Sequence, residues 1–256
     1  MFPVLFKIGT FEVRSYGVML ILGFLVGIWM VRRRAAKFGL EERDVADSSL
    51  MTLFSGIIGA RLMFILLELP YYIKNPGELI SWRFQGLTSF GGLIGGLLYL
   101  WWFCKRRGRS LVAMLDAFSA PMLIASAIGR IGCLLNGCCY GALCQTGVTY
   151  CVPADGQVGL YQPAQLVDAV LNVVGYFVLI AAEKRGLVRG QSIGLFFVLY
   201  GLSRFIYEFW RAGTTSEMLG PVTMAQLLAL AMVLAGGLLF GFFGRRAGRE
   251  DGKVAE

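Results

Sequence analysis

The chain of 256 residues contains no histidine and few charged residues. The absence of histidine excludes the side chain that most often acts as a general base at neutral pH. Charged residues make up only 16% of the chain and hydrophobic residues 57%, with a mean hydropathy of +0.66. A water-soluble domain of this length could not bury so much apolar surface in one core. The composition therefore indicates an integral membrane protein.

Low-complexity tracts, a repeat period and a convincing signal-peptide cleavage site are also lacking. We therefore expect one membrane domain over residues 1–243 and a short basic cytoplasmic tail, expected to be disordered, over residues 244–256. The fold class predicted is an all-α bundle of about seven transmembrane helices with an outer-face arm and loop, because each apolar run is roughly 17 to 25 residues long. These runs are 17–31, 48–69, 86–104, 111–135, 164–182, 192–210 and 222–243.

Most of the 24 Lys and Arg residues lie in the connections after the first, third, fifth and seventh runs, at 32–43, 105–109, 184–189 and 245–253. Basic residues are retained on the cytoplasmic side of a membrane. The predicted amino terminus is therefore outside and the carboxyl terminus cytoplasmic.

Three further arginines, Arg61, Arg130 and Arg204, lie within or at the edge of apolar runs. An arginine at membrane depth costs a few kcal/mol, so it should face the bundle interior and meet an anion or a polar partner. Ion pairs with Asp116, Asp168 or Glu208 would be a purely structural explanation. Three such arginines in one small bundle favour a site for an anionic ligand, because guanidinium matches phosphate in a two-pronged hydrogen bond.

The segment 129–141 reads Gly-Arg-Ile-Gly-Cys-Leu-Leu-Asn-Gly-Cys-Cys-Tyr-Gly. It resembles the signature of the prolipoprotein diacylglyceryl transferase family, Gly-Arg-Ile-Gly-Asn, two apolar residues, Asn-Gly-Glu, two residues, Gly. Cys133 stands in place of the family's asparagine and Cys138 in place of its glutamate. The positions that match are Gly129, Arg130, Ile131, Gly132, Asn136, Gly137 and Gly141.

Other segments resemble family elements in the family's order, at 14–17, 59–61, 89–95, 162–168, 200–211 and 224–226. Two of them depart from the family pattern, with Phe90 and Gln162 at positions where the family has histidine. The resemblance implies transfer of the diacylglyceryl group of phosphatidylglycerol to the lipobox cysteine thiol of a prolipoprotein signal peptide, in the inner (cytoplasmic) membrane of a bacterium. Thioether formation would release glycerol phosphate, with no cofactor, metal or nucleic acid.

The catalytic residues implied are Arg130, Arg204, Tyr16, Tyr200 and Glu208. Residues implied for binding phosphatidylglycerol are Arg130, Arg204, Arg61, Asn136, Gly91, Gly92, Gly141 and Arg211. The acceptor thiol must lose a proton, and Glu208, Asp168, a tyrosine or the departing phosphate could take it. We hypothesise that the phosphate, held by arginine, suffices.

Five of the six cysteines lie at or beyond the end of the fourth run. Disulfides among Cys138, Cys139, Cys144 and Cys151 are expected in an oxidising compartment. A zinc site is not expected, because histidine is lacking and the spacing is irregular. Two alternative functions stay open: a membrane thiol oxidoreductase using Cys138 and Cys139, and a non-catalytic relative that binds lipid.

Overall fold

The computed structural model describes residues 2–9, 11–77, 88–143, 149–151, 159–211, 218–219 and 222–254. Contacts divide the chain into two compact units, Met1–Val31 with Leu115–Glu256, and Arg32–Met114, and each unit is described by itself. The helices in the described residues are α1 (Ser15–Arg34), α2 (Glu42–Leu67), α3 (Leu69–Lys74), α4 (Ser89–Arg107), α5 (Leu111–Asn136), α6 (Ala164–Lys184), α7 (Gln191–Glu208) and α8 (Met224–Val254), with a 3-10 turn η1 (Ala35–Phe38).

Every predicted apolar run coincides with a helix, and five of the helical segments are long and apolar enough to cross a membrane. These five are Ser15–Phe38, Glu42–Leu67, Leu111–Asn136, Ala164–Lys184 and Met224–Ala247. The prediction of a multi-pass helical membrane protein is therefore confirmed. α4 and α7 are helical as expected, while seven crossings and the sides of the two termini stay predictions.

The carboxyl-terminal segment differs from the expected disordered tail. α8 does not end at Phe243 but continues to Val254. The segment 244–254 contains three glycines, which weaken a helix, but no proline that would interrupt the backbone hydrogen bonds continuing from the apolar part of α8.

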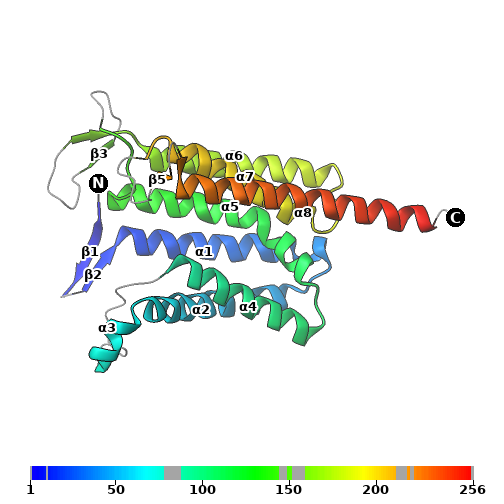
Figure 1. The fold of residues 1–256 in the computed structure, drawn as a ribbon, viewed down its shortest axis with the longest axis horizontal. Helices are drawn as coiled ribbons and strands as arrows, with labels where there is room; N and C mark the ends of the chain where they lie inside the picture. Colours follow the sequence, from blue (N-terminus) through cyan, green and yellow to red (C-terminus); the bar gives the residue numbers. More distant parts are fainter. Residues whose placement is uncertain are drawn as a thin grey trace. The chain divides into compact units, whose positions relative to one another are not determined.

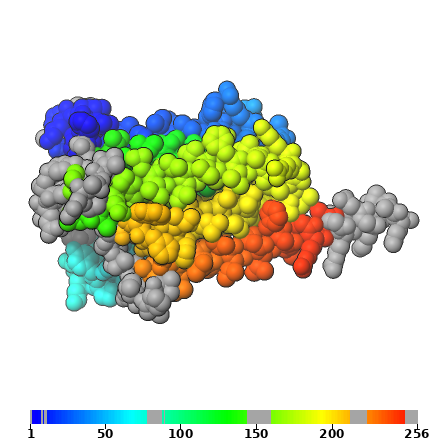
Figure 2. All heavy atoms as spheres, turned by 90° about the horizontal axis from the view of Figure 1, so that it is seen from above, coloured from blue at the N-terminus to red at the C-terminus, as the bar shows by residue number. Residues whose placement is uncertain are grey.

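Helices α5, α6, α7 and α8 of the first unit run side by side (Figure 1). α7 and α8 approach closely, since a Cβ built on Gly194 would lie 2.8 Å from the backbone nitrogen of Phe240, and one on Gly201 would lie 2.8 Å from the carbonyl oxygen of Ala229. A larger side chain at either glycine would separate the two backbones. In the space-filling view, α6, α7 and α8 lie along one face, coloured from yellow-green through orange to red (Figure 2). A core cluster lies beneath them, formed by Ala120, Leu123, Leu179, Ile193 and Phe196.

Asp116 of α5 connects that helix to the start of α7. Its carboxylate accepts hydrogen bonds from the backbone N–H of Gly190, at 2.6 Å, and of Ile193, at 2.9 Å. These groups have no partner within the helix at its amino-terminal end, so a buried carboxylate here satisfies them. Asp116 thus fixes α7 against α5.

The second unit is built on the close packing of α2 against α4. A Cβ on Gly59 would lie 2.5 Å from the carbonyl oxygen of Gly91, and one on Gly95 would lie 2.6 Å from the carbonyl oxygen of Ser55. Backbones can approach this closely only where both helices carry small residues. At the other end of the pair, the guanidinium Nε of Arg109 lies 2.6 Å from Asp44, whose side chain is buried.

Three short antiparallel hairpins complete the described residues. They pair β1 (Val4–Ile8) with β2 (Phe11–Arg14), β3 (Thr149–Cys151) with β4 (Gly159–Tyr161), and β5 (Met218–Leu219) with β6 (Val222–Thr223). All three lie next to helix ends. Of the three, the β1–β2 hairpin leads directly into α1, whose Ser15 N–H donates to the carbonyl of Pro3 at 3.1 Å.

Candidate active site

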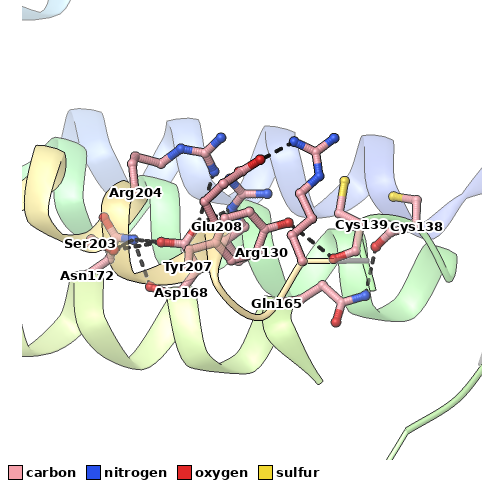
Figure 3. A network of polar contacts seen from close by, with 11 residues as sticks. Arg130, Cys138, Cys139, Gln165, Asp168, Asn172, Ser203, Arg204, Tyr207 and Glu208 are labelled. Carbon is pink, nitrogen blue, oxygen red and sulfur yellow. Dashed lines mark hydrogen bonds and ion pairs between the residues drawn. The ribbon is translucent and has the colours of Figure 1, made fainter. Parts of the chain in front are cut away.

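Arg130 of α5 and Arg204 of α7 meet at one carboxylate, Asp168 of α6. The Nε of Arg130 lies 2.6 Å from Asp168 Oδ2, and a terminal nitrogen of Arg204 lies 3.4 Å from the same oxygen. Both arginine side chains point toward this carboxylate in Figure 3. The side chain of Asp168 is 1% exposed, while those of Arg130 and Arg204 are 16% and 25% exposed. Two partly accessible cations therefore share a single buried anion. Together, the two arginines and the one carboxylate carry a net positive charge.

The other oxygen of Asp168 is held by neutral side chains. Ser203 Oγ donates to Oδ1 at 2.7 Å, and Asn172 Nδ2 donates to it at 2.9 Å. Asn172 also donates to the backbone carbonyl of Asp168 at 2.7 Å. These bonds lock the carboxylate in one orientation, so its second oxygen always faces the two arginines.

Tyr207 lies between the arginine pair and the loop after α5. The guanidinium carbons of Arg130 and Arg204 each lie 4.9 Å from the centroid of its ring, within cation–π range. Its hydroxyl donates to the backbone carbonyl of Cys139 at 3.2 Å, and the residue is 1% exposed. Tyr207 therefore supports the arginines with its ring and the loop with its hydroxyl.

Three cysteines gather next to the arginines, and we call Cys133, Cys138 and Cys139 the three-cysteine cluster. Their Sγ atoms all lie within 4.8 Å of one another. Cys133 lies in the last turns of α5, and the other two lie in the loop that follows (Figure 3 draws Cys138 and Cys139). All three are free thiols.

Electrostatic surroundings lower the pKa of the Cys139 thiol. Hydrogen bonds from the Cys133 and Cys138 thiols to its sulfur are the largest cause, and the guanidinium groups of Arg130 and Arg211 add to the effect. Thiolate is the form of cysteine that acts as nucleophile and metal ligand. The three-cysteine cluster and the arginines therefore share one electrostatic environment.

Backbone pairing brings Arg211 close to this loop. Gly141 forms an isolated β-bridge with Arg211, and its N–H donates to the carbonyl of Gln162 at 2.8 Å. A Cβ on Gly141 would lie 2.6 Å from the carbonyl oxygen of Trp210, so only glycine fits between the two strands. Gly141, implied by the resemblance as a lipid-binding residue, thus has a structural reason for being glycine. Arg211 in turn lies 3.7 Å from the Glu208 carboxylate.

The structure brings most of the predicted site residues of the first unit together. Tyr16 of α1 lies beside the end of α5, since a Cβ on Gly132 would lie 2.9 Å from the Met19 side chain and 3.5 Å from the ring of Tyr16. Asn136 is the last residue of α5 and lies two positions before Cys138. Tyr200 stacks on Phe196, with ring centroids 5.6 Å apart.

Four predicted or family-matched positions belong to the second unit. Arg61 lies over the ring of Tyr72, with its guanidinium carbon 5.6 Å from the centroid. Gly91 and Gly92 face α2, where a Cβ on Gly91 would lie 2.4 Å from the carbonyl oxygen of Gly59. Phe90, at the family's histidine position, is exposed. A role of Arg61, Gly91 and Gly92 in lipid binding stays a prediction.

The predicted disulfides also stay predictions. Cys138 and Cys139 are free thiols, whereas Cys144 and the side chain of Cys151 lie outside the described residues. The sequence analysis does not predict the central position of Asp168 and Tyr207. The sequence offers Asp168 as a structural ion-pair partner or as a proton acceptor, and it assigns no role to Tyr207. A signal was present in the polar residues Asp168, Asn172 and Ser203, which interrupt otherwise apolar runs.

Comparison with known proteins agrees with this geometry. A family model described as prolipoprotein diacylglyceryl transferase matches residues 3–242. Two similar relatives are named phosphatidylglycerol–prolipoprotein diacylglyceryl transferase, one from Clostridium tetani and one from Bacillus cereus. The first is 28% identical over 93% of this chain and 96% of its own length, and the second 30% identical over 98% and 94%. A protein of the same name from Bacillus thuringiensis is also 30% identical over 98% of this chain. With matching motifs, a helical membrane fold and Arg130 of the signature segment paired with Asp168, the chain belongs to the prolipoprotein diacylglyceryl transferase family.

Proposed function

We propose that this chain transfers the diacylglyceryl group of phosphatidylglycerol to a prolipoprotein, as its relatives are named for doing, and that the acceptor is the lipobox cysteine thiol. In this reaction an S–C bond to the glyceryl carbon forms while the C–O bond to phosphate breaks. Glycerol phosphate leaves with the electron pair of the broken bond. The acceptor thiol loses its proton, which ends on the departing phosphate or in the surrounding water.

The observation that carries the proposal is the sharing of Asp168 by Arg130 and Arg204. Phosphate gains negative charge as it leaves, and two guanidinium groups with a charge in excess stabilise that growth. Arginine suits this task because it keeps its charge in a dry site and binds phosphate through two parallel hydrogen bonds. Asp168 is not suited to take the thiol proton, since both of its oxygens are already bound.

The setting of this chemistry is proposed to be the cytoplasmic membrane of a bacterium, crossed about seven times. Counting α4 and α7 as crossings leaves the basic connections on one side, which supports an outside amino terminus and a cytoplasmic carboxyl terminus. The site would then lie toward the outer face, since α5 runs outward from the basic connection before Leu111 and carries Arg130 near its end.

The test is transfer of diacylglyceryl from phosphatidylglycerol to a synthetic lipobox peptide by the purified chain. We expect Arg130→Ala and Arg204→Ala each to reduce the rate at least about 100-fold, as loss of a transition-state charge partner does. Arg185→Ala, at an exposed position directly after α6, is the matched control and should keep most of the rate. If both site variants stay folded and transfer at the wild-type rate, the proposal is wrong. Complementation of a strain depleted of its own transferase would then separate a lipid-binding relative from a thiol oxidoreductase.

A further inference from the structure

The three-cysteine cluster has no role in the function proposed so far, although its sulfurs lie beside the arginines. Within the described residues it is the group of cysteines and carboxylates whose ligand atoms converge in the way a metal ion requires. The sequence spacing, one cysteine followed five and six residues later by two more, gave no reason to expect this convergence. It arises from the path of the loop after α5.

That path is wound tightly. Gly137 has φ +75° and Cys139 φ +62°, so two residues of the loop adopt the left-handed conformation. For cysteine this conformation costs roughly 1–2 kcal/mol and persists only where the surroundings enforce it. The enforcing contacts are visible: Gln165 of α6 donates to the carbonyl of Cys138 at 2.7 Å, and Tyr207 of α7 donates to that of Cys139. The backbone N–H of Cys138 also bonds to the carbonyl of Cys133, at 3.1 Å.

The cluster matches the geometry that zinc requires. Zinc binds thiolate at about 2.3 Å, which places the sulfurs of a tetrahedral site about 3.8 Å apart. Sulfurs that already lie within 4.8 Å of one another reach this separation by small side-chain rotations. Three protein ligands are the number found in catalytic zinc sites, which keep a fourth position for water or substrate.

Charge also favours a metal complex at this point. Three thiolates and one Zn²⁺ carry a net charge of −1, and binding of a fourth thiolate makes the complex more negative. Arg211 forms a backbone bridge with Gly141, two residues after Cys139, and Arg130 lies one helical turn before Cys133 in α5. A negatively charged zinc–thiolate complex would therefore be stabilised by the neighbouring arginines, whereas these arginines would repel a cation without thiolate ligands.

We propose that Cys133, Cys138 and Cys139 bind Zn²⁺ and that the open fourth position binds the thiol of the acceptor cysteine, an inference that rests on the proposed function. Coordination replaces the S–H bond of the acceptor with a Zn–S bond, and the proton passes to water. The bound thiolate then attacks the glyceryl carbon, and the electron pair of the breaking C–O bond stays on the phosphate near the arginines. The thioether product is a weaker ligand than thiolate and leaves the metal. Coordination by zinc would thus explain how a chain without histidine deprotonates the thiol of the acceptor cysteine.

The first test is the metal content of the full chain, purified in detergent without chelator from zinc-supplemented medium and measured by mass spectrometry. About one Zn²⁺ per chain is expected, since three thiolates bind zinc tightly. Cys133→Ser, Cys138→Ser and Cys139→Ser should each lower the content at least about tenfold, and Cys104→Ala, a free cysteine of the second unit, should not. A wild-type chain that neither carries zinc nor takes it up on dialysis overturns the proposal, and so does retention of zinc by all three variants.

The second test asks whether the fourth position binds a thiol. Co²⁺ replaces Zn²⁺ in the wild-type chain, and its visible absorption reports each change of ligand. A lipobox peptide should alter this spectrum without added lipid, whereas the same peptide with serine in place of the acceptor cysteine should not. Equal spectra with both peptides would overturn the proposal. Loss of zinc from Cys144→Ser or Cys151→Ser would also overturn it, because a fourth protein thiolate would then close the site.

The third test separates this inference from the function on which it rests. Removal of zinc from the wild-type chain should lower the transfer rate about 100-fold, and added Zn²⁺ should restore it. A zinc-free chain that transfers at the full rate overturns the metal role and leaves the proposed function intact. A zinc-loaded chain that binds the peptide but transfers no diacylglyceryl overturns the proposed function.

Discussion

At the scale of single residues, the central feature is one carboxylate that forms ion pairs with two arginines. Asp168 lies 2.6 Å from Arg130 and 3.4 Å from Arg204, and Ser203 and Asn172 hold it from the other side. A buried pair of opposite charges often contributes little net stability, but removal of one partner leaves the other uncompensated. The arginines therefore depend on Asp168 for their counter-charge.

The change Asp168→Asn tests this dependence. It preserves the size of the side chain but leaves both guanidinium groups without a counter-charge, so the free energy of unfolding should fall by about 3 kcal/mol. Phosphatidylglycerol should then raise the thermal midpoint of the variant more than that of the wild type, because its phosphate replaces the lost carboxylate. Thermal unfolding in detergent, with and without the lipid, measures both effects. Glu12→Gln, at an exposed ion pair with Lys7, is the control; equal lipid effects in variant and wild type would contradict the prediction.

A second prediction concerns the two uses of Tyr207. Tyr207→Phe removes the hydrogen bond to the Cys139 carbonyl and should lower the free energy of unfolding by about 1 kcal/mol. Tyr207→Leu also removes the ring that both arginines face, and should cost about 1–2 kcal/mol more. Unfolding of the two variants in parallel measures the difference. Identical losses would mean that the ring contributes nothing beyond its hydroxyl.

Sequence reasoning found the arginines but not their arrangement. Arg130 and Arg204 stood out because a cation within an apolar run needs a partner. Asp168 was one of three acidic candidates, and nothing in the sequence selected it over Asp116, which instead binds backbone N–H groups at the start of α7. The choice depends on how α5, α6 and α7 are rotated about their axes, which a pattern of hydropathy does not determine.

At the scale of elements, the packing of α2 against α4 depends on glycine. Gly91→Ala would place a Cβ 2.4 Å from the carbonyl oxygen of Gly59, so the two helices must separate. We expect a loss of about 1–3 kcal/mol in the free energy of unfolding, as overpacking in a tight contact produces. The matched control is Gly241→Ala in α8, where nothing lies within 4 Å, and it should be neutral or slightly stabilising. Thermal midpoints of unfolding measure the stability of the two variants. Equal midpoints would contradict the packing argument.

The helices themselves were predictable, and their irregular connections were not. Long apolar runs indicate helices because lipid offers no partner for backbone groups. The loop of the three-cysteine cluster depends instead on left-handed residues and on anchors from α6 and α7, far along the sequence. Cys139 in particular adopts a conformation that is uncommon for its residue type. No local pattern signals it.

At the scale of the whole molecule, the distribution of basic residues predicts which connections face the cytoplasm. A phosphatase fused after Asn75 should be active, because that enzyme folds outside, and a fluorescent protein fused after Arg109 or at the carboxyl terminus should fluoresce. Fusions at the same positions with the two reporters exchanged are the controls and should be silent. An active phosphatase after Arg109 would mean that the predicted orientation is inverted.

The shared carboxylate has a further consequence for turnover. In the proposed function, phosphate and Asp168 would compete for the same two guanidinium groups, so the affinity for an anion would be lower than two uncompensated arginines would provide. The same competition applies to the released glycerol phosphate, which Asp168 can displace once the covalent link to the lipid is gone. An internal anion of this kind would keep the site from being inhibited by its own product.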